Sequence, residues 1–341
     1  MRLTPDEDAE ELRGVVRAFL DRHCTAGPDD GPGWATATWA RFATELGAVA
    51  LDLPEEHGGA GATFREMAVV AEELGRSVTR LPWLGTSVLA VGALRELDAQ
   101  DLLQRLLTGE ATGTLAVGAE VVAADGRLSG EAPLVVDGAS ADIVLVPAGG
   151  ALYAVEDGAV RERLRTMDPT RELAHVRFDD CPARLLSTDA ASLVARVRHR
   201  AEAALAAEQA GGAAAALDMA VAHAGTRLQF GRPIGSFQAI KHRCAEMMVR
   251  VEAARSAALW AAAAVSDGSP QTDLAVATAG AVCGEAYTWV AAENVQVHGG
   301  IGFTWEHPAH LHVRRAATSA VLFGDRHRRH ERVLELVGVG S

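Results

Sequence analysis

A chain of 341 residues is too long for one small hydrophobic core and predicts two or three domains. Its residues are 49% hydrophobic but only 5% aromatic, which favours close-packed helices rich in alanine, leucine and valine. The formal net charge of −13 argues against a nucleic-acid partner, because binding to a phosphate backbone calls for a concentrated basic surface.

The cysteines and the chain start indicate a compartment. Cys24, Cys181, Cys244 and Cys283 lie far apart without a C-x-x-C spacing, so neither a zinc site nor a disulfide framework is predicted. The N-terminal stretch lacks the apolar core of a signal peptide, and no run is expected to be apolar and long enough to cross a bilayer. We therefore expect a cytoplasmic protein with reduced thiols, no bound metal and no membrane contact.

Residues 1–112 show helical periodicity. Thr4 and Pro5, followed by acidic residues, are typical of a helix N-terminus, and an amphipathic helix is expected up to about His23. Further helices are expected at residues 39–46, 64–75, 85–97 and 99–107. This segment therefore predicts a helical N-terminal domain.

The periodicity changes near Gly113. Short apolar runs separated by Gly, Asp and Pro begin at Leu115, Leu134, Asp142 and Ala151. Such runs are typical of strands, so residues 113–188 predict a small antiparallel β domain.

From residue 189 the pattern is helical to the end of the chain. Helices are expected at residues 190–226, 236–266, 270–297 and 308–337. Residues 189–341 therefore predict a four-helix bundle of small side chains. The whole chain predicts an α+β fold that is mostly α.

A first motif, RLQFGRPIGSFQ at residues 227–238, joins the first two helices of this bundle. Arg227 and Arg232 offer forked donors suited to a phosphate, and Gly231 lets a backbone approach closely. The helix expected to start near Ser236 presents free N–H groups. The motif predicts an anion site, with a helix hairpin carrying solvated arginines as the alternative.

A second motif, QVHGGIGFT at residues 296–304, follows another long helix. The order, spacing and helical context of the two motifs resemble the acyl-CoA dehydrogenase family, and the resemblance covers most of the chain. In that family these segments hold the ADP half of an FAD that is bound to the neighbouring subunit. The resemblance therefore implies that FAD is contacted by Arg227, Gln229, Phe230, Gln238, Gln296, Gly299 and Gly300.

The resemblance implies α,β-desaturation of an acyl-CoA thioester, in which a carboxylate removes the α-proton while flavin N5 accepts the β-hydride. Many members carry that carboxylate in a Tyr-Glu-Gly-Thr segment before the last helix. The corresponding segment here, LFGDR at residues 322–326, puts Gly324 at the position of the glutamate. Asp325, Glu202 and Glu208 remain as candidate bases, although a structural or solvated role is expected for both glutamates.

The family motifs that line the isoalloxazine ring are also missing between Thr114 and Ala148. The chain thus resembles a non-catalytic, cofactor-completing subunit of a hetero-oligomer with two copies of each of two chains, like actinobacterial enzymes for steroid and other bulky acyl-CoA thioesters. Three alternatives stay open. They are a homo-oligomeric dehydrogenase with a relocated base, a structural or regulatory paralogue, and an enzyme of the same fold acting on a non-acyl substrate.

Three histidines in these segments have two interpretations. His298 in the second motif is expected either to contact the cofactor or to bond to loop backbone. His223 and His242 have no metal-ligand partner three or four residues away and are expected to be packing or surface residues.

Overall fold

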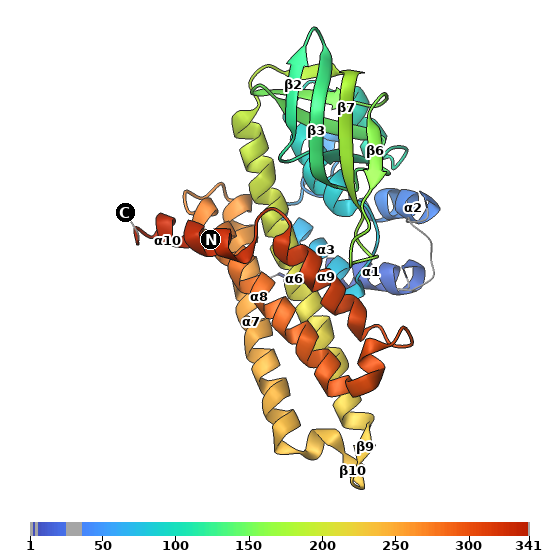
Figure 1. Ribbon diagram of the computed structural model, residues 1–341, viewed down its shortest axis with the longest axis vertical. Coiled ribbons are helices and arrows are strands. Elements are labelled where there is room, and N and C mark those ends of the chain that lie inside the picture. The colour runs from blue at the N-terminus through green and yellow to red at the C-terminus, as the bar shows by residue number, and fades with distance from the viewer. Residues whose placement is uncertain (1–2, 4–5, 25–35, 340–341) are drawn as a thin grey trace. The chain divides into compact units, whose positions relative to one another are not determined.

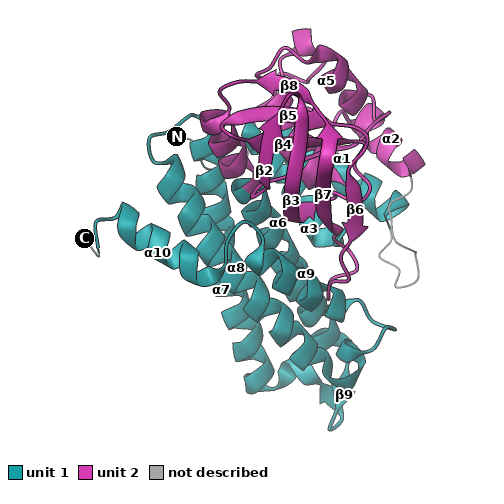
Figure 2. Ribbon diagram, turned by 45° about the horizontal axis from the view of Figure 1, so that its top comes forward, with its two compact units in different colours: residues 1–29, 64–79, 202–341 teal, residues 30–63, 80–201 magenta. Residues whose placement is uncertain are grey.

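The computed structural model describes residue 3, residues 6–24 and residues 36–339, with the elements labelled in Figure 1. The chain divides into two compact units, coloured separately in Figure 2. Unit 1 comprises residues 1–29, 64–79 and 202–341, and unit 2 comprises residues 30–63 and 80–201. The three-domain boundaries at residues 112 and 188 stay a prediction about the sequence segments.

Unit 1 is helical and contains the bundle. Its elements are α1 (Glu7–His23), α3 (Phe64–Ser77), α6 (Ala191–Thr226, in this unit from Glu202), β9 (Leu228–Gln229), β10 (Arg232–Pro233), η3 (Ile234–Ser236), α7 (Gln238–Ser266), α8 (Thr272–His298), η4 (Gly299–Phe303), α9 (Ala309–Val321) and α10 (Arg326–Leu336). The helical C-terminal segment is therefore confirmed, with α6, α7, α8 and α9 as its long bundle helices (Figure 1).

Two predicted helix boundaries in unit 1 need comment. Asp6 caps α1, since its side chain accepts the N–H of Ala9 at 3.1 Å; the predicted cap at Thr4 and Pro5 lies outside the described residues. The single helix expected over residues 308–337 is wrong. The chain breaks between α9 and α10, where Phe323 and Gly324 have φ angles of 61° and 131° that no right-handed helix contains.

Glycines let the helices of unit 1 approach one another. A Cβ on Gly211 of α6 would lie 1.9 Å from the carbonyl oxygen of Glu72, and a Cβ on Gly75 of α3 would lie 2.0 Å from that of Glu208. The two helices therefore cross backbone against backbone at a reciprocal pair of glycines. Next to Gly211, a Cβ on Gly212 would lie 2.4 Å from the buried ring of Tyr287 on α8. Gly211 and Gly212 thus allow α3 and α8 to pack closely against two sides of α6.

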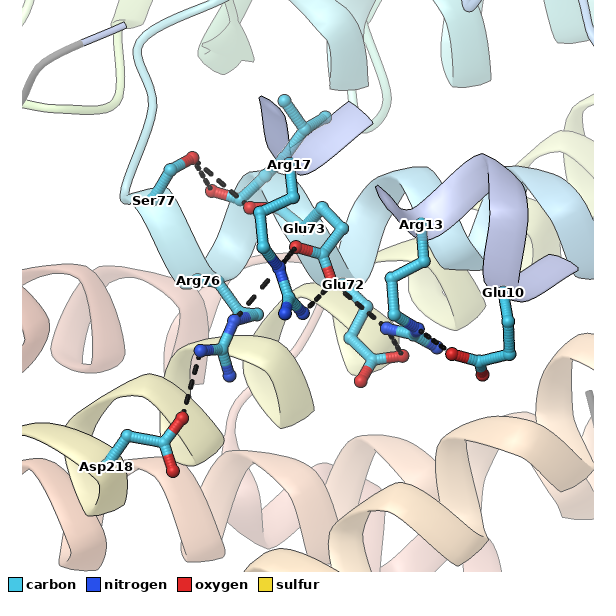
Figure 3. Close-up of polar contacts among 9 residues, drawn as sticks. Glu10, Arg13, Arg17, Glu72, Glu73, Arg76, Ser77 and Asp218 are labelled. Atoms are coloured by element: carbon cyan, nitrogen blue, oxygen red, sulfur yellow. Dashed lines mark hydrogen bonds and ion pairs between the residues drawn. The ribbon is translucent and has the colours of Figure 1, made fainter. Parts of the chain in front are cut away.

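Buried charges join α1 to α3 (Figure 3). The carboxylate of Glu73 is 1% exposed, accepts from Arg13 Nη1 at 3.0 Å and accepts from Arg17 Nε at 2.8 Å. Arg76 of α3 reaches Asp218 of α6 at 2.9 Å. Two arginines on one buried carboxylate satisfy its lone pairs, which is the condition under which a buried charge is tolerated.

Unit 2 contains the strands β1 to β8 and several short helices. Its elements are α2 (Thr36–Leu46), η1 (Glu55–His57), the π-helical turn η2 (Leu84–Ala90), α4 (Val91–Leu94), α5 (Gln100–Leu107), β1 (Gly113–Leu115), β2 (Glu120–Ala124), β3 (Arg127–Val136), β4 (Ile143–Ala148), β5 (Ala151–Val155), β6 (Val160–Arg163), β7 (Leu173–Pro182) and β8 (Arg184–Ser187).

The strands of unit 2 form two four-stranded sheets, with the orders β1-β4-β5-β8 and β2-β3-β7-β6. The described pairings are antiparallel except for β1 and β4, which run parallel with Gly113 opposite Ile143. Buried side chains from both sheets, among them Val144, Val176 and Phe178, make one apolar core. The predicted strand-rich middle segment is thereby confirmed.

One helical segment does not match the expectation that no segment could cross a bilayer. Thr272–Phe303 is long and apolar enough to span a bilayer by length and composition, so the expectation that no segment would be is wrong on that criterion. However, 67% of its most apolar window is buried inside the structure, as in the core helix of a bundle.

Candidate functional site

The first motif forms a hairpin at the end of α6. Gln229 pairs with Arg232 in the strand pair β9–β10, and Phe230 and Gly231 form the turn with φ angles of 52° and 75°. Two consecutive positive φ angles are the signature of a tight type I′ turn. The hairpin projects its side chains into solvent, since Arg227 and Gln229 are exposed and Phe230 is 91% exposed.

The start of α7 leaves donors free beside this hairpin. The helix begins at Gln238, two residues later than expected, and its N-cap residue Phe237 has no side chain that can accept a hydrogen bond. The first N–H groups of a helix have no intrahelical partner, so the end of α7 favours an anion. Arg232 lies over the ring of Phe237 at 4.1 Å, and the hydroxyl of Ser236 is buried with no partner among the described residues.

The second motif follows α8. Gly299 ends the helix with a φ of 65° and donates its N–H to the carbonyl of Val295. Gln296, Gly299 and Gly300 are exposed, and a Cβ on either glycine would meet nothing within 4 Å. These glycines therefore leave the backbone open to an approaching group and are not needed for packing.

Contacts between tilted imidazole rings link the segments that carry the two motifs. The ring of His223 on α6 lies 4.2 Å from that of His298 on α8, and the ring of His298 lies 4.2 Å from that of His307. We call these three residues the histidine column. Sequence reasoning treated His223 and His298 separately, because positions 75 residues apart give no local signal of contact, and it did not single out His307. The predicted contact residues of the two motifs thus share one end of the bundle.

This end of the bundle presents the groups that the resemblance assigns to the ADP half of an FAD. Arg227 and Arg232 supply forked donors for a pyrophosphate, the α7 N-terminus adds free N–H groups, and Gly299 and Gly300 leave room at the backbone. The exposed ring of Phe230 offers an apolar face to a planar base. Gln238 and Gln296 are exposed beside them with amide groups able to donate and accept.

Asp325 is placed as a helix cap. It is exposed, and its Oδ1 accepts the N–H of Arg328 at 2.9 Å at the start of α10. That backbone hydrogen bond from Arg328 is the main cause of the lowered pKa of the Asp325 carboxyl. A carboxylate that is engaged in capping and made less basic is poorly suited to remove an α-proton.

The segment before α10 contains no other carboxylate in either register of the Tyr-Glu-Gly-Thr motif. Placing the motif's glycine on Gly324 puts Phe323 at the glutamate and Asp325 at the threonine, which agrees with the capping role of Asp325. The register that places Gly324 at the glutamate likewise has no side chain there. Neither register of the resemblance aligns a carboxylate with the glutamate of the motif, and the absence of the usual base stays a prediction.

The two glutamates lie on α6. Glu202 is half-buried, and Glu208 is buried with its Oε1 3.4 Å from Nη1 of Arg315 on α9. Arg315 also donates to the carbonyl of Thr79 at 2.5 Å, so the pair joins α6, α9 and the end of α3. This contact set gives Glu208 a structural role within unit 1.

A groove of about 730 Å³ lies elsewhere in unit 1, between α1, α3, α6 and α7. Its wall carries Arg13, Arg17 and Arg76, which are held by the carboxylates of the network in Figure 3. Arg255 also lines the groove, but so do Glu10, Glu72, Asp218 and Glu252, and this acidic lining makes the groove a weaker anion site than the exposed motif end of the bundle.

Comparisons with known proteins agree with the fold and the motifs. Residues 6–114 match the model described as "Acyl-CoA dehydrogenase, N-terminal domain", and residues 172–335 match "Acyl-CoA dehydrogenase, C-terminal domain". Acyl-CoA dehydrogenase IpdE2 of Mycobacterium tuberculosis is 37% identical over 334 residues, which cover 94% of each chain. FadE34 of the same organism is 38% identical over 86% of this chain, but the match spans only 41% of FadE34.

Solved structures of similar proteins agree with these matches. The ChsE4-ChsE5 complex from Mycobacterium tuberculosis contains a chain with a TM-score of 0.89 and 28% identity, covering 99% of both chains. A chain of the Tcur3481-Tcur3483 steroid ACAD has a TM-score of 0.88 and 29% identity, covering 97% of this chain and 98% of that one. Butyryl-CoA dehydrogenase from Megasphaera elsdenii, at 22% identity and a TM-score of 0.90 over 99% of this chain and 100% of its own, shares the fold.

Proposed function

The chain belongs to the acyl-CoA dehydrogenase family of oxidoreductases, and from that premise we propose that it is the cofactor-completing subunit of a heteromeric enzyme. In this proposal the motif end of the bundle binds the ADP half of an FAD whose isoalloxazine ring lies in a partner subunit. FAD supplies the hydride acceptor for α,β-desaturation of an acyl-CoA thioester. The partner supplies the base that removes the α-proton.

The observation that carries the proposal is an asymmetry within unit 1. The side chains of Arg227, Arg232, Gln238 and Gln296 are exposed at one end of the bundle, and a Cβ on Gly299 or Gly300 would meet nothing within 4 Å. The segment before α10, in contrast, has no carboxylate except Asp325, which caps the helix. The chain therefore keeps what is needed to bind a cofactor in trans and lacks a placed base of its own.

The residues have distinct roles in this binding. Arg227 and Arg232 neutralise the pyrophosphate with charge-assisted hydrogen bonds, and the N-terminus of α7 adds backbone donors. Gly299 and Gly300 let the ligand approach the backbone closely. Phe230, which projects from the turn of the hairpin, excludes water from the adenine face.

The relatives support a heteromeric assembly and a bulky substrate. Two similar structures are complexes named for two chains, and one of these is named a steroid ACAD. More than half of FadE34 lies outside its match to this chain, as expected of a polypeptide that joins such a subunit to a second one. We propose a cytoplasmic hetero-oligomer, with two copies of each chain, that acts on a steroid or other bulky acyl-CoA.

The test is the visible flavin spectrum of the purified chain, alone and after co-expression with a second dehydrogenase-like chain. We expect a colourless chain alone and a yellow, active complex. Arg227→Ala should weaken FAD binding in that complex by about 30-fold or more, because truncating one partner of a buried charge pair costs about 2–5 kcal/mol.

Arg177→Ala is the matched control, since it removes an exposed arginine from β7, far along the chain from both motifs. It should leave the flavin content unchanged. Co-purification of the two chains and far-UV circular dichroism check that neither variant disturbs assembly or helix content. Stoichiometric FAD in the Arg227→Ala complex would sink the assignment, and a yellow, active chain alone would favour a homo-oligomeric enzyme.

A further inference from the structure

The histidine column links the segments that carry the two motifs through side chains of three elements. His223 lies in the last turn of α6, His298 ends α8, and His307 lies just before α9. The backbone N–H of Arg227 donates to the carbonyl of His223 at 2.9 Å, and Gly299 directly follows His298. Each motif therefore lies within about one helical turn of a residue of the column, so a displacement of the column would move both motifs.

Hydrogen bonds determine where the column holds its protons. Nδ1 of His298 lies 2.9 Å from the carbonyl of Asn294, which can only accept, so this nitrogen carries a proton and donates it. Nδ1 of His307 accepts the backbone N–H of Ala309 at 3.2 Å, so this nitrogen carries no proton. His307 is therefore neutral in the folded structure, and protonation at Nδ1 would break its bond to Ala309.

The surroundings of the column oppose further protons. Ala309 is the first residue of α9, and the positive end of a helix dipole disfavours a cation at His307. At the other end of the column, His223 lies in the last turn of α6, where the negative end of the helix dipole tolerates a first proton better. A second proton would put like charges on rings about 4 Å apart.

The charged groups that face the column are mostly basic. Arg227 faces His223 from the end of α6, and His310 faces His307 from α9. Arg314 of α9 lies beyond them over the ring of Trp305. Burial is the main cause of the lowered pKa values of His223 and His307, and the neighbouring imidazoles lower both further.

We propose that the histidine column is a proton-sensitive clamp, which holds the two motifs together while neutral and releases them when it takes up protons. Once released, His223 and His307 bind protons at the ordinary histidine pKa of about 6.5, whereas burial in the folded column lowers the pKa of both. Acid therefore favours the open form as the pH falls below about 6.5. The further expectation that opening releases FAD rests on the proposed function. The clamp itself does not depend on that function.

Hydrogen–deuterium exchange on the full chain without cofactor tests the clamp at pH 7.5 and 5.5. After correction for the intrinsic pH dependence of exchange, we expect residues 224–238 and 299–308 to exchange about tenfold faster at pH 5.5. Residues 283–291, in the buried middle of α8, should stay protected at both pH values. Because no flavin is present, the result does not depend on whether this chain binds FAD.

Substitutions of single histidines distinguish an effect of histidine protonation from a general loss of packing in the column. His307→Asn keeps an oxygen that can accept the N–H of Ala309 but does not titrate, so the ratio between the two pH values should fall to about twofold or less. His223→Asn should have the same effect, and His242→Asn, at an exposed position of α7, should keep the wild-type ratio. Equal exchange of the wild-type motifs at both pH values, or a ratio unchanged in both column variants, would overturn the proposal.

Discussion

Two groups of glycines in unit 1 serve opposite purposes. At the crossing of α3 and α6, a Cβ on Gly75 or Gly211 would enter the backbone of the facing helix. At the motif end of the bundle, a Cβ on Gly231, Gly299 or Gly300 would meet nothing within 4 Å. The same residue type is therefore required by packing in one region and leaves backbone accessible in the other, which is what a ligand-binding loop needs.

The largest expected effect is at the helix crossing. Gly211→Ala would put a methyl group 1.9 Å from the carbonyl of Glu72, so α3 and α6 must separate. We expect a loss of at least about 3 kcal/mol in the free energy of unfolding, measured by urea denaturation.

Gly225→Ala is the control on the same helix, because nothing lies within 4 Å of its Cβ position. It should raise the free energy of unfolding by about 0.5–1 kcal/mol through helix propensity. If both substitutions have the same effect, the crossing does not depend on close backbone approach.

A buried histidine in the packed interior of unit 1 is expected to make the free energy of unfolding depend on pH. His312 of α9 is buried against Tyr287, whose hydroxyl lies 3.0 Å from Nδ1 of His312, and burial lowers its pKa to about 4. Because the unfolded chain titrates near 6.5, it binds more protons than the folded chain between these values. The free energy of unfolding should therefore fall by on the order of 3 kcal/mol as the pH falls from 6.5 to 4.

The measurement is urea unfolding of wild type and His312→Gln at several pH values in this range. The variant should lose less stability with acid than wild type does, and the difference between the two curves isolates His312 from the carboxylates. His242→Gln, which removes an exposed histidine from the same unit, is the matched control. Parallel curves for wild type and His312→Gln would contradict the assignment.

The smallest effect on stability is expected at the motif end of the bundle, where a substitution should affect cofactor binding. Gly300→Ala should change the free energy of unfolding by no more than about 0.5 kcal/mol, because its Cβ would contact nothing. It should nevertheless weaken FAD binding to the co-expressed complex by about tenfold, since the methyl group would hold a ligand away from the backbone. Flavin titration of the complex measures this, and unchanged affinity would remove Gly300 from the site.

Local pattern was sufficient for much of this molecule. Helical periodicity identified α1, α6, α7 and α8 with small errors at their ends, and short apolar runs located the strand-rich segment. The two motifs could be recognised because each is continuous in sequence and contains its own turn residues. Composition likewise indicated close helix packing, since a chain with only 5% aromatic residues must build its interior largely from alanine, leucine and valine.

Only the tertiary structure decided which of these residues meet. The His223–His298 contact, the Gly75–Gly211 crossing and the Glu208–Arg315 pair each join residues at least 75 positions apart, so no pattern within a single helix specifies them. The break at Phe323 and Gly324 was missed because periodicity continues through it, whereas the backbone turns there. The sequence by itself determined the elements and the chemistry available, because these depend on neighbours along the chain; burial, pairing and convergence depend on neighbours in space.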